Sequence, residues 1–436
     1  MAFFADDQIG NTIYSWCKDL FPINRSITGK GVRQTLKYFQ KIIPELNIRS
    51  VPSGSLAFDW VVPLEWEVIS GWIKDSSGEK IVDYHESNLC LVGYSNSIDK
   101  VLPLKELKNK VFTIPEQPDA IPYVTSYYDN TWGFCMPYNK LKSLEDGEYH
   151  VYIDAKKFCG VLNYGEIIIP STTKNDSEIF ISTYICHPSM ANNELSGPAV
   201  AIALAKWISE LEIRTFNYRF VFVPETIGPL VYMSKNLSEM KKRVIAGFNL
   251  TCVGDDRAYS YMPSRNGATL SDKAAKHVLK WLDPDYKSYH WGQRGSDERQ
   301  YCAPGADLPI ASIMRTKWAE YPEYHTSKDT LGGVVTPEGL YGGFTANKLT
   351  IEAIENNFNP VATFVGEPQL GKRGLYPNVS RRVSTNWVPR ILEFLTWSDG
   401  DHDLFDIADK CQCPIWELYD LKKNLINLGL IKYCKT

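Results

Sequence analysis

Polar side chains that could do chemistry stand directly after four apolar runs of the sequence, where a folded core does not need them. They lie at 187–194, at Glu225, at 251–256 and at 325–329. The first and last of these segments begin with His187 and His325, and all four contain carboxylates. Imidazole nitrogens and carboxylate oxygens are the common protein ligands of zinc. These segments are therefore the candidates for catalytic or metal-binding chemistry.

Each candidate segment is predicted to follow a β-strand. The preceding runs are rich in β-branched and aromatic residues and span 179–186, 218–223, 244–250 and 308–315. Helical patterns alternate with them at about 197–210, 228–240, 271–282 and 337–355. This alternation predicts parallel βαβ units, and hence an α/β fold with a mostly parallel mixed sheet and helices on both faces. The carboxyl ends of parallel strands meet at one edge of the sheet, so the four segments should lie close together.

Two imidazoles and several carboxylates at one edge would form a zinc site with an open position. Zinc would polarise a carbonyl and lower the pKa of bound water, while a carboxylate base accepts the proton. Simpler roles stay open for single residues: His187 as a hydrogen-bonded turn residue, Glu225 beside a helix N-terminus, and Asp329 as a cap. We expect structural or surface roles for His85, His150, His277, His290 and His402.

The chain of 436 residues is long enough for two or three domains. Residues 7–46 show two amphipathic helix patterns, and short apolar-aromatic runs between Gly, Pro, Asn and Ser follow them, which is typical of an all-β domain. We therefore predict N-terminal helices of the core at 1–50, an inserted β domain at 51–150, the α/β core at 151–375, and a separate module at 376–436.

The C-terminal module has the pattern of a winged helix-turn-helix, with three short helices and a closing apolar strand. Its residues 381–436 contain eight basic and eight acidic side chains, a net charge of zero. The expected recognition helix, 415–427, offers only Lys422 and Lys423 as basic residues. A DNA-binding domain normally shows a clear basic face, so a protein partner is expected here rather than DNA.

The overall composition excludes several classes of protein. A net charge of −4 argues against a protein built to coat nucleic acid. Neither a signal peptide nor an apolar run long enough to cross a membrane is predicted. The ten cysteines form no CxxC pair, which argues against a structural zinc knot and a disulfide scaffold. A cytoplasmic protein is expected, and association into a homo-oligomer stays open.

The motifs HP…NNELSG, PETIG, NLTCVGDD, GSDERQY and YHTSKDTL, in this order, resemble those of the zinc aminopeptidase superfamily. More specifically, the whole chain is similar to a bacterial peptidase-like family with an aminopeptidase core, an inserted β domain and a C-terminal winged helix, which is associated with polysaccharide biosynthesis. The resemblance implies a zinc aminopeptidase fold of the phosphorylase/hydrolase-like type. It also implies zinc-dependent hydrolysis of a peptide, aminoacyl or amide substrate, with a sugar-linked substrate among the options.

By this resemblance, His187 and His325 correspond to the two histidine ligands and Glu225 to the general base. Ser296 and Asp297 lie in a segment that approaches the substrate, so they are predicted to bind it.

The sequence departs from the superfamily at residues that would contact metal. Asn193 stands where the superfamily has its metal-bridging aspartate, and Ser189, Thr226 and Thr251 replace three further acidic residues. A neutral amide cannot balance two divalent charges, so one zinc ion is expected rather than two.

Glu194, next to Asn193, could supply the missing oxygen ligand. A single zinc held by His187, Glu194 and His325 would leave one position for water. Glu225 would then be the base or a fourth ligand.

An alternative function stays open. The core could be a catalytically inactive scaffold whose aromatic-rich insert and winged helix bind saccharides or proteins. Trp60, Trp66 and Trp72 could stack on sugar rings, and packing within the insert is the competing interpretation.

Overall fold

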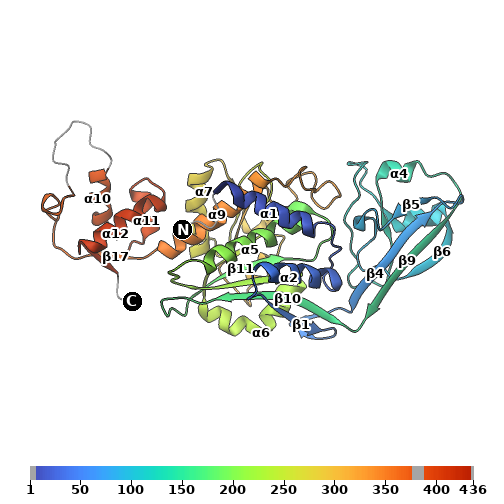
Figure 1. Ribbon diagram of the computed structural model, residues 1–436, viewed down its shortest axis with the longest axis horizontal. Helices are drawn as coiled ribbons and strands as arrows, with labels where there is room; N and C mark the ends of the chain where they lie inside the picture. The colour runs from blue at the N-terminus through green and yellow to red at the C-terminus, as the bar shows by residue number, and fades with distance from the viewer. Residues whose placement is uncertain (1–5, 376–386, 434–436) are drawn as a thin grey trace. The chain divides into compact units, whose positions relative to one another are not determined.

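The computed structural model describes residues 6–375 and 387–433 and shows two compact units (Figure 1). The first comprises Met1–Ser271 and Tyr286–Thr345, and the second comprises Asp272–Asp285 and Ala346–Thr436. Within the described ranges, no helix is both long enough and apolar enough to cross a membrane.

An eight-stranded mixed sheet forms the centre of the first unit. In spatial order its strands are β1 (Asn47–Pro52), β10 (Val161–Ile169), β12 (Asn217–Val223), β11 (Glu178–Tyr184), β13 (Val244–Asn249), β16 (Ile310–Met314), β14 (Ser260–Met262) and β15 (Lys287–Ser288). The four central strands, β12, β11, β13 and β16, run parallel, whereas β10 and β14 pair antiparallel with their central neighbours. The predicted mostly parallel mixed sheet is therefore confirmed, and the four candidate segments follow strands that end at the same edge.

Helices cover both faces of this sheet. They include α1 (Asp6–Leu20), α2 (Lys30–Ile42), α5 (Ser196–Ser209), α6 (Ile227–Arg243) and the short α8 (Glu298–Tyr301). Figure 1 shows α1, α2 and α5 on one face and α6 on the other. Alternate residues of β12 point to opposite faces: Phe222 packs on Phe39 of α2 with ring centroids 5.6 Å apart, while Val221 and Val223 join the core cluster that contains α6. Because both faces are covered, β11 is buried along its whole length.

The segment between β1 and β10 forms a second sheet, which is antiparallel. Its order is β5 (Lys80–Asp83), β4 (Glu65–Lys74), β9 (Glu148–Phe158) and β6 (Ile98–Pro103). The shorter elements around it are β2 (Leu56–Ala57), β3 (Trp60–Val61), η1 (Asn88–Cys90), α3 (Leu104–Leu107), η2 (Lys108–Lys110), β7 (Val111–Phe112), β8 (Phe134–Cys135) and α4 (Tyr138–Lys142). Two of its tryptophans pack within the unit, since Trp66 stacks on Tyr94 and Trp72 on Tyr152.

The remaining elements are η4 of the first unit and the helices and strands that lie wholly or mostly in the second unit. They are α7 (Leu270–Leu282), η4 (Trp291–Gln293), α9 (Pro337–Asn356), β17 (Pro360–Ala362), η5 (Gly371–Arg373), α10 (Trp387–Thr396), α11 (Leu404–Lys410), η6 (Ile415–Leu418), α12 (Tyr419–Asn427) and β18 (Ile431–Tyr433). Three helices and the antiparallel pair β17–β18 form the predicted winged helix-turn-helix. Residue 376, its predicted first residue, lies outside the described ranges. Lys422 of α12 donates to the backbone oxygen of Asn356 at 3.0 Å, so a contact inside the unit occupies one of the two lysines of the expected recognition helix.

Candidate metal and catalytic site

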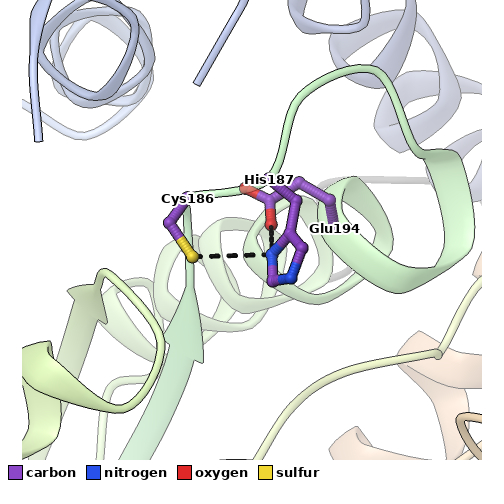
Figure 2. Close-up of side chains that lie close together, drawn as sticks. All are labelled: Cys186, His187 and Glu194. Carbon is purple, nitrogen blue, oxygen red and sulfur yellow. Dashed lines mark hydrogen bonds and ion pairs between the residues drawn. The ribbon is translucent and has the colours of Figure 1, made fainter. Parts of the chain in front are cut away.

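His187 lies just beyond the end of β11 and is almost fully buried. Its Nδ1 is 2.9 Å from Glu194 Oε2, and its Nε2 is 3.5 Å from Glu225 Oε2. Figure 2 shows Cys186 and Glu194 both directed at Nδ1, with the cysteine sulfur 3.5 Å away. Nε2 is therefore the nitrogen that faces Glu225 and is available to a ligand.

Glu194 lies between His187 and a buried arginine. Arg25 Nε is 3.3 Å from Glu194 Oε1, and neither side chain exposes any area. Arg25 also donates to the backbone oxygens of His187 and Leu20, at 2.9 and 2.8 Å. Burial by itself lowers the pKa of His187, but the hydrogen bond and the charge of Glu194 outweigh it and raise that pKa.

A cation bound through Glu194 would meet the positive charge of Arg25. The ligand atoms of Cys186, His187 and Glu194 lie within 4.8 Å of one another. A cation held by these three side chains would also be repelled by the charge of Arg25. A carboxylate on the far nitrogen of a histidine fixes the ring and its tautomer for metal binding. The structure thus places Glu194, a predicted zinc ligand, where it can orient His187.

A π-helical turn, η3 (Ala191–Leu195), brings Asn193 and Glu194 to the site and runs directly into α5. All residues of η3 are buried, although three of its five side chains are polar. Asp329 holds this turn, because its carboxylate accepts the backbone N–H groups of Asn192 and Asn193 at 2.7 and 2.9 Å. Asp329 therefore caps a helical turn that precedes it by far in the sequence, and not the turn that follows it.

The neutral residues at the expected metal positions bond to one another. Asn193 Nδ2 donates to Tyr184 Oη at 2.9 Å, and Tyr184 Oη lies 2.6 Å from Thr251 Oγ1. Asn193 Oδ1 is buried and has no hydrogen-bond partner within the described part of the chain. A buried acceptor without a partner is costly, so this oxygen is a candidate ligand for a cation.

Glu225 follows β12 in a strained turn. Thr226 has φ 66° and ψ −67°, and the N–H of Ile227 donates to the backbone oxygen of Glu225 at 2.8 Å. This is a γ-turn of the rare kind, which costs energy for any residue other than glycine. Two contacts hold it: Asp297 Oδ1 accepts the N–H of Thr226 at 2.8 Å, and Arg299 donates to Thr226 Oγ1 at 2.6 Å.

Glu225 remains accessible in this position, with a quarter of its side chain exposed. Burial raises the pKa of its carboxyl, although His187 and Arg299 act in the opposite direction. The pKa of Glu225 is raised on balance, which is the direction that general-base catalysis favours.

Ser296 and Asp297, the predicted substrate-binding residues, lie behind the γ-turn. Both are buried, and Ser296 Oγ accepts a hydrogen bond from Asn249 at 3.1 Å. Burial and the nearby charge of Glu225 raise the pKa of Asp297 well above its usual range. The geometry gives Asp297 a direct contact with the backbone that presents Glu225.

His325 reaches the site from the segment after β16. Its ring centroid is 5.6 Å from that of His187, and its own ring stacks on Tyr324 at 3.9 Å. Burial and the proximity of His187 lower the pKa of His325 to about 3. A neutral imidazole has a free lone pair on one nitrogen, and this neutral form is the one that binds a metal.

The inserted domain also contributes to the site, which the sequence did not reveal. The ring of Tyr123 lies 5.0 Å from that of His187 and 5.2 Å from that of His325. No sequence pattern marks Tyr123, because its neighbours in the site come from distant segments.

The donor set fits one zinc ion. The two imidazole rings lie 5.6 Å apart, and Asn193 binds Tyr184, whose ring is 5.2 Å from that of His187. Arg299 and Tyr184 engage the hydroxyls of Thr226 and Thr251, so contacts within the protein occupy these two side chains.

A polar cavity of about 820 Å³ borders the site. The cavity lies between the segment 66–89 and the turn that joins α1 to α2. It extends to Ser189 and Ser327, which follow His187 and His325 by two residues each. Its lining mixes hydroxyl and amide side chains with apolar, aromatic and charged ones. Such a surface offers hydrogen-bonding groups as well as apolar contacts to a ligand.

The family model described as a domain of unknown function, DUF4910, matches residues 14–357, and a winged helix-turn-helix model matches residues 359–433. A Clostridium acetobutylicum protein, named for polysaccharide biosynthesis and for an aminopeptidase-like domain, is 40% identical over 415 residues, or 92% of each chain.

Solved structures share the same fold. The 2.37 Å crystal structure of a Clostridium acetobutylicum protein named as a peptidase has a TM-score of 0.91 and 38% identity, covering 98% of this chain and 97% of the other. A zinc aminopeptidase from Bacillus subtilis has a TM-score of 0.59 at 13% identity, covering 79% and 95%. An M28 peptidase precursor from Shewanella amazonensis has a TM-score of 0.57 at 12% identity, covering 80% and 96%. At such low identity, the last two show a common fold.

Proposed function

Since this chain belongs to the DUF4910 family and combines an aminopeptidase-like fold with a C-terminal winged helix, we propose that it is a hydrolase that cleaves a peptide or amide bond with one zinc ion. One observation carries the proposal. The rings of His187 and His325 lie 5.6 Å apart at the edge where parallel strands end, and His187 Nε2 is 3.5 Å from Glu225 Oε2, while the buried Asn193 Oδ1 on the adjoining turn has no partner within the described residues.

In this proposal, His187 Nε2, a ring nitrogen of His325 and Asn193 Oδ1 hold the ion. Three protein ligands leave the fourth position to water, as in catalytic zinc sites. Bound zinc would lower the pKa of water and polarise the carbonyl of the substrate. The Glu194 carboxylate binds His187 Nδ1 at 2.9 Å, and this contact keeps Nε2 directed at the ion.

Glu225 is the proposed general base. Its Oε2, 3.5 Å from His187 Nε2, accepts a proton from the attacking water and returns it to the leaving nitrogen. The γ-turn at Thr226 fixes the direction of this carboxylate. Asp297 and Arg299 hold the turn from behind, so their proposed role is to position Glu225.

The substrate class is proposed to be an amide carried by a sugar or a sugar-linked peptide. The name of the Clostridium relative links that protein to polysaccharide biosynthesis. The polar cavity beside the two histidines has room for a saccharide portion next to the reacting bond.

Elemental analysis of purified protein tests the metal, and Glu225→Gln tests the base. We expect about one zinc per chain, and Glu225→Gln should keep the zinc and lose turnover. Glu210→Gln, on the exposed end of α5, is the matched control and should keep both. Loss of zinc from Glu225→Gln would make Glu225 a ligand, and zinc-free protein from zinc-replete medium would exclude the proposed chemistry.

A second candidate is a scaffold that binds saccharides without catalysis. The hydrogen bonds among Asn193, Tyr184 and Thr251 favour this scaffold, because they satisfy most of the polar groups at the expected metal positions without an ion. In that case, zinc titration would leave the melting temperature unchanged, whereas an oligosaccharide bound in the cavity would raise it. The opposite pair of results favours the hydrolase.

A further inference from the structure

Residues 121–123 of the inserted domain lie against the segment that carries His325. The N–H of Tyr123 donates to the backbone oxygen of His325 at 2.8 Å, and the N–H of Ser327 donates to that of Ile121 at 2.9 Å. The side chain of Ser327 adds a third bond by accepting the N–H of Ile121 at 2.9 Å. The insert is therefore tied to one of the two histidines by its backbone, although the two segments lie about 200 residues apart.

The same segment directs two tyrosines at the site. The ring of Tyr123 contacts both histidine rings, and its Oη lies 2.8 Å from Tyr127 Oη. A tyrosine hydroxyl carries its proton at neutral pH, so both hydroxyls can donate hydrogen bonds.

The proposed hydrolysis would gain from a hydrogen-bond donor in addition to the ion. Attack on an amide carbonyl places negative charge on its oxygen, and fixed hydrogen-bond donors at that point give a large part of many rate enhancements. The guanidinium of Arg25 lies against Glu194, and that of Arg299 holds Thr226. The ring of Tyr123 lies beside both histidines, and its hydroxyl contacts that of Tyr127.

We propose that Tyr123, supplied by the inserted domain, is a catalytic residue whose hydroxyl donates a hydrogen bond to the oxygen of the reacting carbonyl. The two hydroxyl oxygens of Tyr123 and Tyr127 lie 2.8 Å apart, and in this proposal Tyr127 is the donor of that bond, which leaves the proton of Tyr123 for the substrate and strengthens its donation. No covalent bond to tyrosine forms, and no proton leaves it. This inference rests on the proposed hydrolase function and adds a donor from another domain to the same site.

Tyr123→Phe, Tyr127→Phe and Tyr128→Phe test the proposal in the full-length protein. Tyr128 is the matched control, because it belongs to the same segment but is exposed and binds the backbone of Val61. With a panel of aminoacyl p-nitroanilides, we expect Tyr123→Phe to lower kcat by about 100- to 1,000-fold with little change in KM. Tyr127→Phe should lower kcat less, and Tyr128→Phe should leave it unchanged.

A second measurement does not depend on turnover. Butylboronic acid becomes a tetrahedral anion like the reacting carbonyl, and transition-state analogues bind through the interactions that catalysis uses. Calorimetry should show weaker boronate binding by Tyr123→Phe, by about 10-fold or more, with zinc content and melting temperature as in the wild type.

The outcomes separate the two proposals. If the wild type holds zinc and turns over, but Tyr123→Phe keeps full kcat and boronate affinity, the role of Tyr123 is excluded and the hydrolase stands. If the wild type neither holds zinc nor binds the boronate, both proposals fall.

Discussion

Replacing Glu194 by Gln distinguishes a buried partner of Arg25 from a zinc ligand. Glutamine keeps the shape and one hydrogen-bond acceptor, but removes the negative charge that Arg25 faces at 3.3 Å. Both side chains are fully buried, so solvent does not screen the change. Leaving one partner of a buried ion pair uncompensated costs about 3–5 kcal/mol. Because Arg25 also donates to two backbone oxygens, we expect about 3 kcal/mol, the lower end of that range.

The assay is urea unfolding of zinc-free protein, followed by tryptophan fluorescence. Glu210→Gln is the control, because Glu210 also pairs at 3.3 Å, with Lys206, on the exposed end of α5. A surface pair of this kind contributes at most about 1 kcal/mol. We therefore expect Glu194→Gln to lower the free energy of unfolding by at least 2 kcal/mol more than Glu210→Gln does.

One result would refute this reasoning. If Glu194→Gln unfolds like Glu210→Gln without zinc, but loses its stabilisation by added zinc, then Glu194 binds the metal directly. The original prediction from the sequence would then be correct, and Arg25 would have to be satisfied by its backbone contacts alone.

Two further predictions concern the turn below Glu225 and the second unit. Asp297→Ala removes the acceptor of the Thr226 N–H, so we expect kcat to fall by at least 10-fold with zinc retained. Asp297→Asn keeps an acceptor and should restore much of the rate. Equal rates for the wild type and both variants would contradict the role of the turn. Burial lowers the pKa of Lys422 to about 8 from its ordinary 10.5. The unfolded chain then binds this proton more tightly, so the free energy of unfolding should rise as pH increases from about 8 towards 10.5. Urea unfolding of the wild type and of Lys422→Met at several pH values should show this rise in the wild type alone. Parallel pH curves for the two proteins would exclude Lys422 as its source.

Much of the fold follows from local patterns. The buried strand β11 and helix α5 carry a continuous apolar run and a helical apolar run, so their types are predictable without neighbours. Their parallel arrangement follows from the alternation of strands and helices. The antiparallel pairing of β10 and β14 with the central strands depends on chain reversals whose direction the local pattern does not encode.

The site was less predictable than the fold, because its geometry depends on long-range contacts. The sequence indicated that His187 and His325 share one edge, and the structure brings their rings within 5.6 Å. It could not indicate that Arg25, from the turn after α1, would be buried against Glu194. Nor could it show that Tyr123 from the insert would contact both histidines.

The π-helical turn η3 has a consequence for how this site could have arisen. A π-turn accommodates one more residue than an α-turn, and such turns often mark functional sites inside α-helices. Deleting a single residue from η3 would restore an α-turn and leave the rest of α5 in place. The side chains before the deletion would rotate by about 100° around the helix axis. Met190, before η3, is extended, so this turn opens the helical segment, and a difference of one residue here decides whether Asn193 and Glu194 face the site while the rest of the fold is spared.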